Sequence, residues 1–173
     1  MKRILACLSL LLSAAPAMAA LSLTSTDIRP GAEIPAAQIY PRCGGQNVSP
    51  QLSWSGAPAG TKSFVLTMID ISVKPAQWSH WVVVDLPPEV ASLARGIKAL
   101  PGNAKAVVSN FGDAYYDGPC PPKGTGMHEY RLTIWALPLA TTDIAGDTVA
   151  ADLASKLSRL SLDHASLTGF VTR

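Results

Sequence analysis

The 173-residue chain has few charged residues, and beyond Lys2 and Arg3 neither sign is in excess. Charged residues make up 15% of it, and the formal net charge of +2 comes entirely from Lys2 and Arg3. The other twelve basic residues balance twelve acidic ones. Nucleic acids and anionic membrane surfaces attract proteins with a strong positive field, so this balance argues against both as partners.

The motifs of several large enzyme classes are also missing. The sequence contains no G-x-S-x-G nucleophile motif, no Walker-type phosphate loop, no G-x-G-x-x-G dinucleotide motif and no H-E-x-x-H zinc motif. It also lacks internal repeats, low-complexity tracts and long charge blocks. Nothing therefore marks an internal domain boundary or a common catalytic machinery, and no cofactor is expected.

The N-terminal segment has the pattern of a secretory signal peptide. It begins with Lys2 and Arg3, continues with an apolar run over residues 4–12 and reaches an Ala-Met-Ala sequence. The run is too short to span a bilayer, so stable membrane insertion is not expected. We expect residues 1–19 to be removed and residues 20–173 to form a single domain in the periplasm or outside the cell.

Cysteine is scarce: beyond Cys7, in the expected signal peptide, the chain has only Cys43 and Cys120. In an exported chain an even pair predicts a disulfide, which would stabilise the fold by about 4 kcal/mol in the chain-entropy model. Two free thiols or a shared metal ion are the alternatives.

Compact apolar and β-branched runs, bounded by turn residues, predict several strands. The clearest lie at residues 21–28, 63–70, 80–87 and 130–137. Glycine and proline interrupt residues 31–54, which should form short edge strands and turns, and residues 165–173 should add a last short extended segment.

One helix is expected, over residues 147–160. Asp147 is a plausible N-cap, and an apolar stripe follows at Val149, Leu153, Leu157 and Leu160. His164 would then lie beyond the helix as a partner of its C-terminal dipole. Many short strands and one late helix predict a mainly β fold, an antiparallel β-sandwich with a C-terminal peripheral helix.

Polar side chains cluster at the ends of the expected strands. Asp70 ends one strand and His80 begins the next, so antiparallel pairing places them at the same edge. The stretch GPCPPKGTGMHEY, residues 118–130, is too rich in proline and glycine for helix or central strand. It should be an ordered loop that delivers His128 and Tyr130 to the start of a strand.

Each of these residues also has a purely structural interpretation. Asp70 can cap a turn, His80 can be a buried histidine between tryptophans, and His128 can hydrogen-bond its own loop. A metal site with two histidines and one carboxylate is chemically feasible, but no two of these residues have the spacing of helical ligands.

Four blocks of the sequence together resemble the phosphatidylethanolamine-binding protein family, in particular its bacterial Raf-kinase-inhibitor-like branch (YbhB/YbcL type). The blocks are CGGQNVSPQLSWSGAPAGTKSFVLTMID, WSHWVVVDLP, YYDGPCPPKGTGMHEYRLTIWAL and HASLTGFVTR. The resemblance implies two antiparallel sheets with a small anion-binding pocket at one edge. By position, the implied pocket residues are Asp70, His80, Gly118 with Pro119, and His128, with Tyr130 beside them.

Two positions depart from the family pattern. Its Asp-Pro-Asp element is Asp70-Ile71-Ser72 here, and its His-Arg pair is His128-Glu129. We expect Ser72 to hydrogen-bond the Glu129 carboxylate across the edge of the pocket.

The resemblance implies an exported binding protein for a phosphoryl or related anionic head group. Histidines that protonate near pH 6.5 would bind such a group more tightly as the pH falls. The alternatives are a kinase- or protease-inhibitor-like protein that binds a partner protein through its surface, and a hydrolase that uses Asp70 and His80 as an acid/base pair.

Overall fold

The computed structural model describes residues 20–144, 146, 148 and 150–173. The expected signal peptide, the N-cap Asp147 and Val149 lie outside the described residues. Within them, no helix has the length and apolar character needed to cross a membrane.

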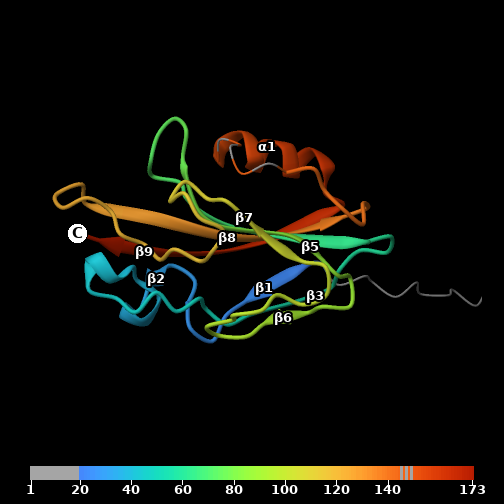
Figure 1. Cartoon of the computed structure of the whole chain (residues 1–173), viewed down its shortest axis with the longest axis horizontal. Helices are drawn as coiled ribbons and strands as arrows, with labels where there is room; N and C mark the ends of the chain where they lie inside the picture. The colour runs from blue at the N-terminus through green and yellow to red at the C-terminus, as the bar shows by residue number, and fades with distance from the viewer. Residues whose placement is uncertain (1–19, 145, 147, 149) are drawn as a thin grey trace, which may run out of the picture.

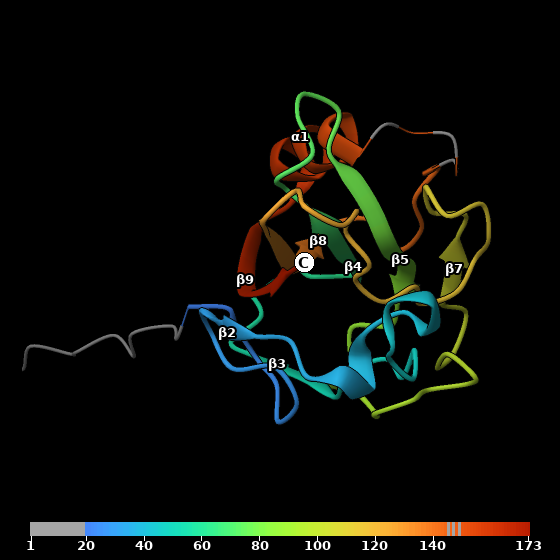
Figure 2. The same ribbon diagram turned by 90° about the vertical axis from the view of Figure 1, so that its left-hand side faces the viewer.

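The chain folds into two β-sheets and a helix, stacked as three layers (Figures 1 and 2). A six-stranded sheet has the order β2-β9-β8-β4-β5-β7, and a three-stranded sheet has the order β1-β3-β6. Neighbouring strands are antiparallel except β2 and β9, which are parallel. The bounds are β1 Ser22–Thr24, β2 Ala32–Glu33, β3 Leu52–Ser55, β4 Ser63–Asp70, β5 Trp78–Leu86, β6 Ser92–Leu93, β7 Lys105–Val107, β8 Met127–Leu137 and β9 Asp163–Thr172. The expected mainly β sandwich is confirmed.

The core lies on both faces of the large sheet, which explains the continuous apolar runs of its central strands. All eight residues of β4 are buried. One face packs against the small sheet, where Leu66 and Leu132 share a cluster with Trp54. The other face, to which Val65 of β4 belongs, packs against the helix. Each fully buried side chain of this size stabilises the fold by about 2 kcal/mol.

The helix α1 (Ala150–Leu160) covers the outer face of the large sheet (Figure 1). Leu153 and Leu157 are buried there, as the apolar stripe predicts. Leu160 departs from the prediction, because the side chain of this last helical residue is 38% exposed. The helix contacts β5 and β8, and Leu160 is its last residue before the turn to β9.

Strand β9, at residues 163–172, closely matches the extended segment expected at residues 165–173 and begins two residues earlier. It pairs with β8 over ten positions, from Asp163 opposite Ala136 to Thr172 opposite Met127. His164 lies inside this strand and stacks on Trp135, with 4.8 Å between ring centroids. The assignment of His164 to the helix C-terminus was therefore wrong, because the strand begins immediately before it.

Candidate functional site

Strand register brings the predicted polar residues together at one end of the large sheet. Asp70, the last residue of β4, lies opposite Trp78 of β5 and Tyr130 of β8. His80 and His128 each lie two residues from one of these partners, so they point to the same face of the sheet.

These side chains line a cavity of about 370 Å³, which we call the His80–His128 cavity. Its lining comprises Asp70, Val73, Trp78, His80, Phe111, Cys120, Pro121, Pro122, His128 and Tyr130. Four predicted site residues are thus brought together: the aspartate, both histidines and the tyrosine. Gly118 and Pro119 are buried but lie outside this lining.

The Asp70 carboxylate holds the ring of His128. Its Oδ2 lies 2.6 Å from His128 Nδ1, and its Oδ1 accepts a hydrogen bond from the Ser72 amide at 2.9 Å. The second ring nitrogen, Nε2, lies 3.0 Å from Thr125 Oγ1. A carboxylate in this position fixes the orientation of an imidazole and places its proton on Nδ1.

His80 is held differently, by a backbone carbonyl. Its Nδ1 donates to the oxygen of Asp117 at 2.8 Å, so in the neutral ring Nε2 is an acceptor. Burial lowers the pKa of His80 from 6.5 to about 4, although Asp117 and Asp70 oppose this shift. The expectation that both histidines protonate near pH 6.5 is therefore wrong for His80, because desolvation of its charged form outweighs the hydrogen bond.

Tyr130 supplies a buried hydroxyl. Its side chain is fully buried, and its oxygen has no hydrogen-bond partner among the described residues. Burial, and then the negative charge of Asp70, raises the pKa of the phenol. The group therefore stays protonated and can act as a donor beside the carboxylate.

A disulfide fixes the proline-rich side of the cavity. Cys120 is bonded to Cys43, the last residue of the 3-10 helix η2 (Pro41–Cys43), as the cysteine pair predicts. The next two residues, Pro121 and Pro122, line the cavity. Arg173 donates to the Pro121 carbonyl at 3.2 Å, so the loop is tied down on both sides.

Gly118 and Pro119 hold this loop against the segments on both sides of η2. The Gly118 amide donates to Asn47 Oδ1 at 2.7 Å, and the Pro119 carbonyl accepts from the Tyr40 amide at 3.1 Å. A Cβ atom on Gly118 would lie 2.0 Å from the Gln38 carbonyl oxygen, so only glycine fits. The contacts of Gly118 and Pro119 therefore position the loop, and the Gly118 N–H is already used in one of them.

The two positions that depart from the family pattern do touch, though not as expected. Ser72 Oγ accepts from the Glu129 backbone amide at 3.0 Å instead of donating to its carboxylate. The carboxylate lies 3.9 Å from Arg131, an exposed pair. This difference follows from the antiparallel pairing of β4 and β8, which turns the Glu129 amide toward the end of β4.

Sequence reasoning missed part of the lining. Phe111 comes from the loop after β7, and its ring lies 5.0 Å from that of His80. Nothing in the local sequence marks it. The ring of Trp78 lies 6.3 Å from that of Phe111. Its position two residues before His80 in a strand could have indicated that it lines the same cavity.

The described part of the chain contains no group of three or more His, Cys, Asp or Glu residues arranged to hold a metal ion. The Asp70 carboxylate accepts a hydrogen bond from His128 and not from His80, so the acid/base pair of Asp70 and His80 considered from the sequence is not formed. The polar chemistry of the cavity consists of a carboxylate–imidazole pair, a neutral imidazole acceptor and a phenol donor.

Comparison with known proteins gives a consistent result. The family model for phosphatidylethanolamine-binding protein matches residues 24–172. The chain is 32% identical over 157 residues to a UPF0098 protein of Aquifex aeolicus (strain VF5), covering 90% of each chain. It is 36% identical over 155 residues to the UPF0098 protein YbhB of Escherichia coli (strain K12), covering 86% of this chain and 98% of the relative.

Among solved structures, that of Escherichia coli YbcL, described as a new member of the mammalian PEBP family, matches with a TM-score of 0.80. The two share 32% identity, and the match covers 88% of this chain and 98% of YbcL. The chain therefore belongs to the phosphatidylethanolamine-binding protein family.

Proposed function

We propose that this protein is exported and that its His80–His128 cavity binds a phosphoryl or related anionic head group. The observation that carries the proposal is the mixed hydrogen-bonding capacity of one apolar cavity. Tyr130 can donate, and His80 Nε2 can accept. The Cys43–Cys120 disulfide supports export, because such bonds persist in oxidising compartments.

This arrangement favours a ligand that both accepts and donates hydrogen bonds. The singly protonated phosphate monoester has charged oxygens that can accept a hydrogen bond from the Tyr130 hydroxyl. Its P–O–H group can donate to His80. A dianion would be repelled by Asp70 and would leave His80 without a donor. Charge-assisted bonds of this kind contribute roughly 1.5–3 kcal/mol each.

The pH dependence then comes from the ligand's own proton. The second pKa of a phosphate monoester is about 6, so the monoanion fraction rises about tenfold between pH 7 and pH 5. Affinity for the monoester should rise by the same factor, whereas a phosphodiester has no such proton and should show a flat profile.

Isothermal titration calorimetry with phosphoethanolamine and glycerophosphoethanolamine at pH 5 and pH 7 tests this. We expect the pH effect for the monoester alone, and its loss in His80→Phe. His164→Phe is the matched control, because that histidine stacks on Trp135 in β9, outside the cavity lining. Absence of binding by both ligands to folded protein over this range would refute the proposal.

We propose binding without turnover, since the Asp70 carboxylate is engaged by His128. Inhibition of a kinase or protease through the surface stays a separate prediction. Pull-down from cell-envelope or host extracts with wild type and a His80→Ala/His128→Ala variant tests it. Retained capture by the double variant would separate partner binding from the cavity.

A further inference from the structure

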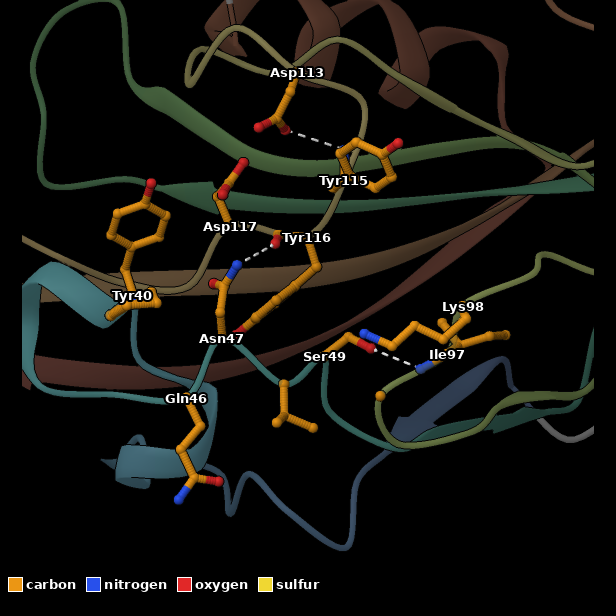
Figure 3. Close-up of a pocket in the computed structure, with 13 residues that line it drawn as sticks. Tyr40, Gln46, Asn47, Ser49, Ile97, Lys98, Asp113, Tyr115, Tyr116 and Asp117 are labelled. Carbon is orange, nitrogen blue, oxygen red and sulfur yellow. Dashed lines mark hydrogen bonds between the residues drawn. The ribbon is translucent and has the colours of Figure 1, made fainter.

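A second and larger hollow adjoins the His80–His128 cavity, on the far side of Asp117. It measures about 600 Å³, and we call it the Asp117 groove. Three segments form it, around residues 40–49, 96–98 and 113–117 (Figure 3). Asp117 serves both hollows, because its carbonyl accepts from His80 while its carboxyl group lines the groove.

One oxygen of the Asp117 carboxyl group is buried and unpaired among the described residues. The residue is only 4% exposed, and its Oδ2 atom is buried with no hydrogen-bond partner among the described residues. Its carboxyl group points toward that of Asp113 (Figure 3). An unpaired buried carboxylate oxygen is costly, so this position requires either a proton or an N–H group from outside.

Neighbouring polar groups in the groove already have partners. The Asn47 amide nitrogen donates to the Tyr116 carbonyl at 3.0 Å, and its oxygen accepts from the Gly118 amide. The Tyr116 hydroxyl donates to the Gln38 carbonyl at 2.8 Å. Asp113 Oδ1 accepts from the Tyr115 amide at 3.2 Å, so the buried oxygen left without a partner among these described groups is Asp117 Oδ2.

Burial, and then the hydrogen bond and charge of Asp113, raises the pKa of Asp117 to about 7. Two adjacent carboxyl groups can share a hydrogen bond only while one of them is protonated. Without a bound cation, the groove therefore holds one exchangeable proton between the two residues below neutral pH, and it carries two adjacent negative charges above it.

We propose that the Asp117 groove binds an organic cation, whose ammonium or guanidinium group donates hydrogen bonds to the carboxylates of Asp113 and Asp117. A guanidinium group matches two adjacent carboxylates well, because its N–H donors lie in one plane. The exposed ring of Tyr115 and the ring of Tyr40 line the same groove and offer aromatic faces to a cation.

Two cations of the chain lie nearby. Lys98 lines the groove, but the ion pairs of the described residues do not join it to either acid. The Arg42 guanidinium lies 6.0 Å from the centre of the Tyr40 ring. The other titratable groups facing Asp117 are the Tyr116 phenol, which stays protonated, and His80, which contacts only its carbonyl.

The bound cation replaces the shared proton. With an Asp117 pKa of about 7, the proton-free groove should make up about one tenth of the protein at pH 6 and most of it at pH 8. The apparent affinity should therefore rise about tenfold between these pH values. This dependence is opposite in sign to that expected for a phosphate monoester in the His80–His128 cavity.

Titration calorimetry with agmatine and with the peptide acetyl-Gly-Arg-Gly-amide, at pH 6 and pH 8, tests the proposal. Two buffers of different ionisation enthalpy measure the proton released. We expect binding of at least one probe, tighter at pH 8, with proton release at pH 6. Tighter binding of agmatine indicates a free amine as the natural ligand, and tighter binding of the peptide indicates a basic side chain of a partner; both support the site.

Asp113→Asn and Asp117→Asn should each weaken binding at least about tenfold. Asp113 is exposed, so its variant should fold even if that of Asp117 does not. Glu89→Gln, at an exposed acid outside the groove, is the matched control for the charge change and should bind like wild type. Failure of both probes to bind folded wild type at pH 8, or equal binding by Asp113→Asn and Glu89→Gln, would overturn the proposal.

Discussion

Lowering the pH should expose the energetic cost of keeping His80 neutral. Burial lowers its pKa in the folded protein from 6.5 to about 4, whereas the unfolded chain takes up a proton at the ordinary value. Between these values the unfolded state binds more protons, so stability falls as the pH falls. The loss between pH 7.5 and pH 4 amounts to about 3 kcal/mol for this one group.

Urea unfolding of wild type and His80→Gln at a series of pH values measures this contribution. The difference in unfolding free energy between the two proteins cancels groups that titrate alike in both, including Asp117, whose raised pKa has the opposite effect on stability. We expect wild type to lose about 3 kcal/mol relative to the variant between pH 7.5 and pH 4.

His164→Gln controls for removal of an imidazole, because His164 is exposed and lies outside the cavity lining. Parallel stability curves for wild type and His80→Gln would refute the reasoning, since they would mean that His80 takes up its proton equally in both states.

Three further predictions concern the same end of the molecule. Tyr130→Phe removes a buried hydroxyl without a partner, so thermal unfolding should show equal or up to about 1 kcal/mol greater stability, while calorimetry shows weaker phosphoethanolamine binding; a destabilised variant would mean that the hydroxyl is already paired. Replacing Cys43 and Cys120 by serine should cost about 4 kcal/mol in urea unfolding, because the bond spans 77 residues, and an unchanged midpoint would contradict this. Gly118→Ala should destabilise by about 3 kcal/mol through its clash with backbone, compared with about 1 kcal/mol for Gly124→Ala, where only the positive φ of 80° opposes a side chain; equal losses would show that the loop can move.

Patterns that are local in the sequence predicted the central strands well. The stretch SFVLTMID is β4 from its first residue to its last, because turn residues bound a run that is buried on both faces. Strand β9 begins two residues before the segment expected at residues 165–173. Its length comes from ten pairings with β8, a tertiary contribution that propensity does not contain.

The site residues that lie at strand ends could be predicted from the sequence. Asp70 and His80 follow from antiparallel geometry, and His128 from its loop and from the family resemblance. The roles of individual atoms were not predictable, because they depend on burial: His80 is a neutral acceptor only because the Asp117 carbonyl and the Phe111 ring enclose it. The Asp117 groove depends on three loops whose sequences have no periodicity.

The partly open position of Trp78 gives the cavity a built-in optical reporter. It is 40% exposed, whereas the chain's other three tryptophans, Trp54, Trp81 and Trp135, are at most 6% exposed. An aqueous quencher such as acrylamide therefore acts mainly on the indole at the cavity. Shielding of its fluorescence on addition of a compound would reveal occupancy in an unlabelled sample, at concentrations too low for calorimetry.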